Sequence, residues 1–220
     1  MGLGRPAIWA FALGFGIGEA QSAASLTLTL LARQIAVVAS APNDDRIPTV
    51  AILLDDAAGV SPTTLTKTEA IATDVFRQAG VQVRWTNCSF SEAEHRNPPG
   101  CQLSLDVPTV IVKILPDAEA RRWAPPANRL GFCLDKDVYL LMPRIRAVAE
   151  RQALPIWLVL GHALVHEAGH ALLGPGHSQR VMRADFRKPD WRQAEKGQLL
   201  FAAHDAYRIR EELLKLPGGR

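Results

Sequence analysis

One stretch of sequence decides the fold, His166-Glu167-Ala168-Gly169-His170. If it is helical, positions four apart lie one turn above each other, so His166 and His170 project from the same face. Two such imidazoles can bind one metal ion, and Glu167 then stands beside that ion without binding it. There it can accept a proton from a water that the ion acidifies. The stretch therefore predicts a helix that carries a metal centre with hydrolytic chemistry.

A third imidazole, that of His177, follows the predicted helix and can join the first two if the chain turns back toward them. Gly174-Pro175-Gly176 supplies the turn, because glycine adopts the left-handed conformation that ends a helix and proline cannot continue one. His177 can then reach the face that holds His166 and His170. Three nitrogen ligands and one open position are typical of a catalytic zinc site. We predict one Zn²⁺ bound by these three histidines, with Glu167 as the general base.

This pattern resembles that of the metzincins, H-E-x-x-H-x-x-G-x-x-H followed by a methionine. Here Gly174 and His177 fall four and seven residues after His170 instead of three and six, so one residue, in effect Leu173 or its neighbour, is inserted. We expect the helix to run one residue further. Met182 corresponds to the family's methionine and would form the floor beneath the zinc. The run H-E-x-G-H-x-L-L-G, then H-S and M-R-A, is similar to that of uncharacterised bacterial matrixin-like proteins.

The resemblance covers roughly residues 47–220, with specific motifs only in 166–184. It implies an α+β fold of the zincin or metzincin type, with a twisted five-stranded mixed sheet, an active-site helix and a small C-terminal helical subdomain. The upper subdomain would be 47–174 and the lower one 175–220. The activity that it implies is that of a zinc-dependent endopeptidase.

The apolar patterns between residues 49 and 216 predict strands and helices independently of the motif. Alternating or continuous apolar runs predict strands, and Ser61-Pro62 and Pro155 predict the starts of two helices. By the resemblance, Leu130–Leu134 would be the edge strand against which a peptide lies. The predicted strands are 49–54, 81–85, 109–115, 130–134 and 138–142, and the helices are 62–79, the motif helix from 155, and a closing helix 191–216 with Leu199, Leu200, Ala203, Ile209 and Leu213 inward.

The N-terminal 46 residues look like an export region. Arg5 precedes an apolar stretch, 7–18, and small residues suited to cleavage follow it. We predict a signal peptide at 1–23, a linker at 24–46 and a secreted or periplasmic protein. The alternative is a retained anchor, since 26–41 prolongs the apolar character, and only then would a membrane be a partner.

Two cysteines flank a polar, proline-rich loop. Cys88 and Cys101 bracket residues 89–100, and a disulfide between them is typical of an exported protein. The alternative is a pair of free thiols. Cys133 lies in an apolar strand pattern and is expected to be free and buried.

The length, composition and net charge of the chain limit the kinds of partner that we expect. The chain has 220 residues, 48% of them hydrophobic, and a formal net charge of +3, which fits one catalytic domain without a nucleic-acid footprint. We expect a monomer that acts on a peptide or protein substrate and binds no nucleic acid.

Several alternatives stay open. The motif could lie on an ordinary amphipathic helix, and Met182 could be a core residue only. The site could be a non-catalytic zinc-binding module closed by Cys133 or His162, or a hydrolase of a non-peptide amide.

His95 and His204 are expected at the surface. If His177 is not the third ligand, the next candidates are Asp185, Glu195 and His204.

Overall fold

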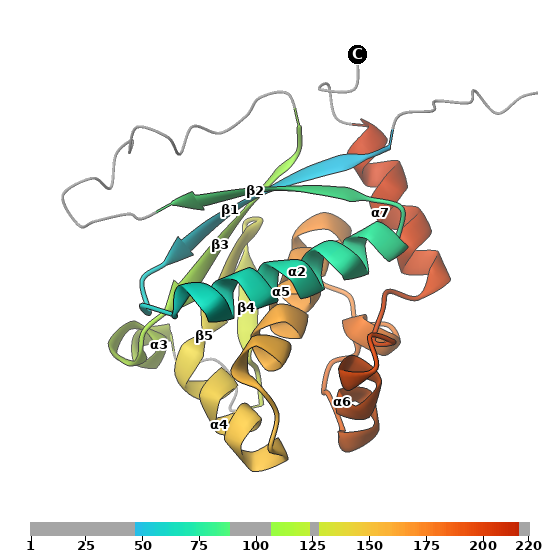
Figure 1. The fold of residues 1–220 in the computed structure, drawn as a ribbon. Coiled ribbons are helices and arrows are strands. Elements are labelled where there is room, and N and C mark those ends of the chain that lie inside the picture. Colours follow the sequence, from blue (N-terminus) through green and yellow to red (C-terminus); the bar gives the residue numbers. More distant parts are fainter. Residues whose placement is uncertain (1–46, 89–106, 124–127, 216–220) are drawn as a thin grey trace, which may run out of the picture. The chain divides into compact units, whose positions relative to one another are not determined.

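The computed structural model describes residues 47–88, 107–123 and 128–215, and these contain a five-stranded sheet in the order β2-β1-β3-β5-β4 (Figure 1). β1 is parallel to β2 and β3, β3 is parallel to β5, and β4 pairs antiparallel with β5 at the end of the order. The predicted mixed sheet and edge strand are confirmed. The strands are β1 (Thr49–Asp56), β2 (Gln82–Cys88), β3 (Thr109–Leu115), β4 (Gly131–Leu134) and β5 (Asp137–Leu141).

The edge strand is joined to its neighbour by a two-residue turn. Asp135 and Lys136 both have positive φ, 50° and 77°, which is the conformation that a tight antiparallel hairpin requires. The turn is shorter than the predicted Asp135-Lys136-Asp137, because Asp137 already belongs to β5. It sets the register in which Gly131 lies opposite Leu140.

Two helices pack against each other on one face of the sheet, α2 (Pro62–Gln78) and α5 (Ile156–Leu173). The predicted start of α2 is confirmed, since the Ser61 side chain accepts a hydrogen bond from Thr64 N at 3.3 Å. α5 begins one residue after Pro155, which is its N-cap. Its length and apolar composition would suffice to cross a membrane. Residues 158–169 are all buried inside the protein, so α5 is a core helix and the amphipathic-surface alternative is wrong.

Two helices were absent from the sequence prediction, α3 (Asp117–Trp123) and α4 (Met142–Gln152). Met142, assigned to a strand above, is the first residue of α4, and Pro143 follows it in the first turn, where a missing N–H costs nothing. α3 buries only Ala120, so it has no apolar periodicity to detect.

The predicted closing helix 191–216 is wrong as a single element. Two helices take its place, α6 (Lys188–Glu195) and α7 (Ala203–Lys215). Gly197 has φ +67° and follows the end of α6, where its conformation stops the helix. Leu199, Ile209 and Leu213 are buried as predicted. Ala203 is exposed, because it lies at the start of α7 and not inside a longer helix.

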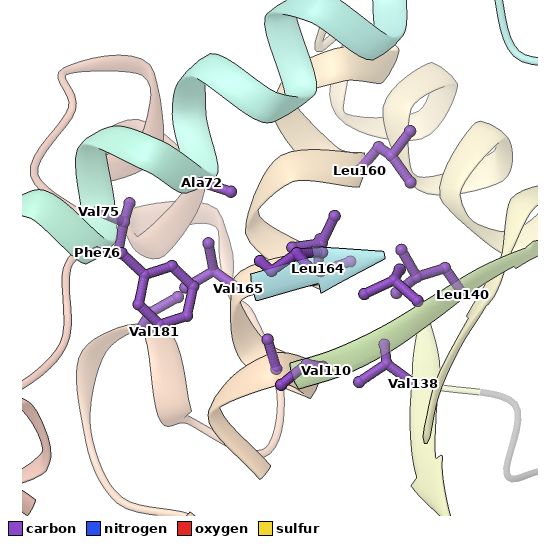
Figure 2. Packing of buried hydrophobic residues seen from close by; sticks show 14 of the residues in the cluster. Ala72, Val75, Phe76, Val110, Val138, Leu140, Leu160, Leu164, Val165 and Val181 are labelled. Carbon is purple, nitrogen blue, oxygen red and sulfur yellow. The ribbon is translucent and has the colours of Figure 1, made fainter. Parts of the chain in front are cut away.

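One buried apolar cluster joins the elements on both sides of the expected subdomain boundary at 174/175. Side chains of α2, α5, β3 and β5 meet in it, as Figure 2 shows, together with Val181. Phe201, between α6 and α7, places its ring 5.4 Å from the ring of Phe76 in α2. Arg210 of α7 donates a hydrogen bond to the Ala79 carbonyl at 2.6 Å. The residues after 174 therefore share a core with those before it.

Some of the predictions fall outside the described residues. The signal peptide at 1–23 and the linker at 24–46 lie there, as do His95 and Cys101. The Cys88–Cys101 bridge therefore stays a prediction. Cys133 is free, as expected, although it is half-buried instead of fully buried.

Replacement of Phe76 tests the shared core. Its side chain is fully buried, and removing a buried phenylalanine ring leaves a cavity that costs about 3–5 kcal/mol. We expect Phe76→Ala to lower the free energy of unfolding in urea by that amount. Tyr207→Ala, at a side chain 54% exposed, is the control and should change it by less than about 0.5 kcal/mol. Equal effects of the two substitutions would contradict the described packing.

Candidate metal centre

Three imidazoles converge at the end of α5. His166 and His170 come from the last turns of the helix and His177 from the segment that follows it, and their possible ligand atoms all lie within 4.8 Å of one another. The His170 and His177 rings are 4.8 Å apart at 86°, and those of His166 and His177 are 5.5 Å apart. The structure thus brings together the three residues that the sequence singled out.

Two backbone carbonyls orient two of these rings. His166 Nδ1 lies 2.7 Å from the Val181 carbonyl oxygen, and His170 Nδ1 lies 3.1 Å from that of Gly174. A carbonyl only accepts, so each Nδ1 carries the proton and donates it. In the neutral imidazole the other nitrogen, Nε2, then presents a lone pair. Such hydrogen bonds are the usual means of fixing the tautomer of a metal-binding histidine.

The arrangement of the Nε2 atoms fits a bound cation. Those of His166 and His170 are 3.1 Å apart, and two lone pairs at that distance repel each other unless a positive charge lies between them. Two nitrogens bound tetrahedrally at about 2.0–2.1 Å to a zinc ion would stand roughly 3.3 Å apart. The donor set and its spacing therefore suit a metal that prefers nitrogen ligands.

Burial keeps two of these imidazoles neutral. The pKa of His166 is lowered to about 4, mainly by desolvation, with smaller lowering effects from His170, His177 and Arg129 and an opposing effect of the Val181 bond. The pKa of His170 is lowered for the same main reason. Both rings are consequently free of a second proton at neutral pH, which is the state that binds a metal.

Glu167 is buried next to the imidazoles. Its side chain is 7% exposed, and desolvation raises its pKa to about 7, while the positive charge of Arg129 acts in the opposite direction. A carboxyl that titrates near neutrality can both accept and donate a proton. The main chain of the edge strand lies against it, since a Cβ added to Gly131 would stand 2.9 Å from Glu167 Cγ and 2.7 Å from the Tyr139 carbonyl oxygen.

Met182 packs directly beneath the metal-binding helix. It lies in a short 3₁₀ segment, Arg180–Met182, and is 1% exposed. A Cβ added to Gly169 would stand 2.4 Å from Met182 Sδ and 3.0 Å from its Cε. The residue before Met182 provides the carbonyl that orients His166. Met182 is thus a core residue packed against α5 at Gly169, and its role as a floor beneath a metal ion stays a prediction.

The inserted residue is accommodated by one more residue of helix. α5 runs through Leu173, and Gly174 N donates to the His170 carbonyl at 2.9 Å. Gly174 has φ 88° and ψ −175°, an extended conformation at positive φ that is essentially restricted to glycine. This differs from the left-handed helical conformation expected above. It turns the chain sharply, and the exposed His177 is thereby directed back to the helix face.

A cavity of about 1060 Å³ opens over the three imidazoles and Glu167. Its volume is just above the range that ligand pockets usually occupy, about 300–1,000 Å³. One wall comes from the start of the edge strand and the other from the segment after Met182. Residues of these walls include Arg129, Leu130, Cys133, Asp185 and Phe186.

The other candidate ligands lie elsewhere. Among the described residues, the histidine, cysteine and acidic groups close enough to hold a metal ion are the three histidines alone. His162 Nδ1 bonds the Leu158 carbonyl at 2.9 Å, and its ring faces a second cavity. Cys133 shares the wall of the first cavity but is not within the ligand group. Neither residue is placed to close the site as the non-catalytic alternative requires, and Asp185, Glu195 and His204 are exposed and outside the group.

Sequence reasoning missed three features of this centre. The orienting carbonyls of Val181 and Gly174 are backbone groups, which no residue pattern reveals. Phe186 has its ring centroid 5.6 Å from that of His166 in an edge-to-face arrangement, and it also packs on Trp191. Arg129 affects the pKa values of His166, Glu167 and His170. A lone arginine before a strand gives no signal in the sequence.

No protein-family model matches the chain, and no curated protein matches it either. Among solved structures, the chain is similar to the crystal structure of archaemetzincin from Methanopyrus kandleri, with a TM-score of 0.47 and 14% sequence identity. That likeness covers 80% of this chain and 100% of that chain. The matrixin-like branch expected from the motif region stays a prediction.

The contact between Gly169 and Met182 can be tested by substitution. Overpacking a buried site costs about 1–3 kcal/mol, against roughly 1 kcal/mol that alanine gains over glycine in a helix. With the Cβ and Sδ atoms so close, we expect Gly169→Ala to lower the melting temperature. Combined with Met182→Ala, its cost should be smaller than in the wild-type background. Additive effects in this double-mutant cycle would mean that the two residues do not touch.

Proposed function

We propose that the protein is a zinc-dependent endopeptidase, with zinc bound by His166, His170 and His177. The observation that carries the proposal is the convergence of three imidazole nitrogens on the floor of an open cavity, next to a buried carboxyl group that is not a ligand. A structural zinc site has four protein ligands and no use for such a carboxyl. Three ligands and an accessible fourth position are typical of hydrolytic zinc enzymes.

Zinc in this position would supply Lewis acidity toward a water molecule and toward a substrate carbonyl. Glu167 would accept the proton of the attacking water and then donate it to the leaving amine, which restores the carboxylate. The Val181 and Gly174 carbonyls hold the rings of His166 and His170 in one orientation throughout. Met182 packs against α5 at Gly169, which prevents α5 from moving toward the core at this point.

The position of the edge strand β4 is a reason to propose a peptide as the substrate. β4 is the last strand in the sheet order and contributes to the wall of the cavity. An extended peptide can add to such an edge through main-chain hydrogen bonds. Membership of the matrixin-like branch, export by residues 1–23, the Cys88–Cys101 bridge and a monomeric state belong to the same proposal.

Metal analysis of the purified protein, combined with a peptide-library digest, tests the proposal. We expect one zinc per chain and cleavage within peptides that stops on addition of a chelator and resumes on addition of zinc. A zinc-loaded protein that cleaves none of the library would contradict the peptidase assignment. Cleavage that a chelator leaves unchanged would contradict the proposal that the reaction depends on zinc.

His177→Ala tests the third ligand. With two imidazoles left, we expect most of the bound zinc to be lost at neutral pH, as measured by elemental analysis after gel filtration. His204→Ala removes an exposed histidine outside the cluster and should retain one zinc per chain. Full zinc content in the His177→Ala variant would show that another group is the third ligand.

Glu167→Ala separates chemistry from metal binding. The three imidazoles remain, so zinc content should match that of the wild type, and the melting temperature should not fall. Loss of a general base typically costs about 10²–10⁴ in rate, and we expect kcat to drop by that factor. Glu150→Ala, at an exposed position of α4, is the matched control. Turnover at the wild-type rate would remove Glu167 from the mechanism.

A further inference from the structure

Arg129 occupies a special place in the cavity wall. It lies two residues before the first residue of β4, and its side chain lines the same cavity as the three imidazoles and Glu167. Its charge acts on His166, Glu167 and His170, which places the guanidinium within electrostatic reach of the reacting centre. It is therefore a cation in the wall of the cavity into which a peptide would have to enter to reach the three imidazoles.

Three other arginines line the same cavity. Arg183 and Arg208 are already engaged with protein groups, and Arg151 is not among the charges that act on His166, Glu167 and His170. The Nε atom of Arg183 lies 3.7 Å from an oxygen of Asp190, and Arg208 donates to the Leu173 carbonyl at 3.2 Å. Within the described residues, the side chain of Arg129 forms neither an ion pair nor a hydrogen bond, and it is exposed. A guanidinium carries donors in a planar fork that match a carboxylate. That fork is free to bind one here.

The backbone that carries this side chain is held on both sides. Arg144 donates from Nη1 to the Arg129 carbonyl at 3.0 Å. Asn128 donates from Nδ2 to Asp185 Oδ1 at 2.5 Å, which links the two walls of the cavity next to Arg129. The same bond occupies one oxygen of the nearby carboxylate of Asp185. The Arg144 bond restrains the Arg129 main chain, which reduces the entropy lost when this residue binds a ligand.

We propose that Arg129 is a specificity-determining residue that binds a carboxylate of the substrate adjacent to the scissile bond. The inference rests on the proposed peptidase function, because the anion that peptides offer is a carboxylate. Its source is either the free C-terminus, with cleavage close to the chain end, or an aspartate or glutamate side chain. Both would form the bidentate, charge-assisted pair that arginine favours.

The experiment uses zinc-loaded protein and peptides built on a sequence that the library digest has identified. One pair differs only in a C-terminal acid or amide, and a second pair differs only in Glu or Gln next to the scissile bond. We expect the wild type to prefer the acidic member of one pair by about 10- to 100-fold in kcat/KM. The pair that shows the preference identifies the source of the carboxylate.

Substitutions then connect the preference to Arg129. Arg129→Gln should abolish it, and Arg129→Glu should reverse it in favour of a peptide with lysine at the same position. Arg192→Gln removes an exposed arginine of α6 outside the cavity and should leave activity and preference unchanged. The inference is overturned if the wild type prefers neither acid, if Arg129→Gln retains the preference, or if it slows all peptides equally, since Arg129 would then act on the reacting centre.

A binding measurement separates this inference from the proposed activity. Calorimetric titration of the zinc-loaded Glu167→Ala variant with the same pairs reports carboxylate binding without turnover. Tighter binding of an acid that disappears in the Glu167→Ala/Arg129→Gln double variant supports the inference independently of the rate at which the wild type hydrolyses these peptides. Equal affinity for acid and amide in both pairs contradicts it, whatever the outcome of the digest.

Discussion

The hydrogen bond from His166 Nδ1 to the Val181 carbonyl is the interaction on which the rest of the centre depends. It connects the metal-binding helix to the turn that follows, and it fixes the nitrogen that the ring presents to the cavity. The same turn presses Met182 against Gly169 and leads into the cavity wall. A neutral, oriented imidazole is possible here because α5 is buried along most of its length. The burial and the orientation of this imidazole therefore have a common origin.

Much of this arrangement could be predicted because its signals are local. Ser61-Pro62 marks the start of α2 through a side-chain cap, and the apolar run of β1 reports a strand covered on both faces. The spacing of four residues places His166 and His170 on one face of a helix, with Glu167 beside that face. Gly174 marks the turn to His177. In each case a residue type and its immediate neighbours determine the backbone conformation.

What escaped prediction depends on contacts between distant residues. Phe186 lies against His166 only because the segment after Met182 folds back under α5. Gly131 must lack a side chain because Glu167 and the Tyr139 carbonyl come close to it from other elements. The separation of α6 from α7 escaped because residues 191–216 are apolar at spacings that one long helix would also satisfy. Their actual arrangement follows from Phe201 packing against Phe76.

The continuous core has a consequence for how the cavity behaves mechanically. Enzymes whose two halves have separate cores can open and close by rotation about a hinge. Here Phe76, Val181 and Phe201 belong to one cluster that includes residues from before and after residue 174, and rotation of one part against the other would expose those apolar side chains to water. The width of the cavity is accordingly set by the fold, without a hinge between two separate cores.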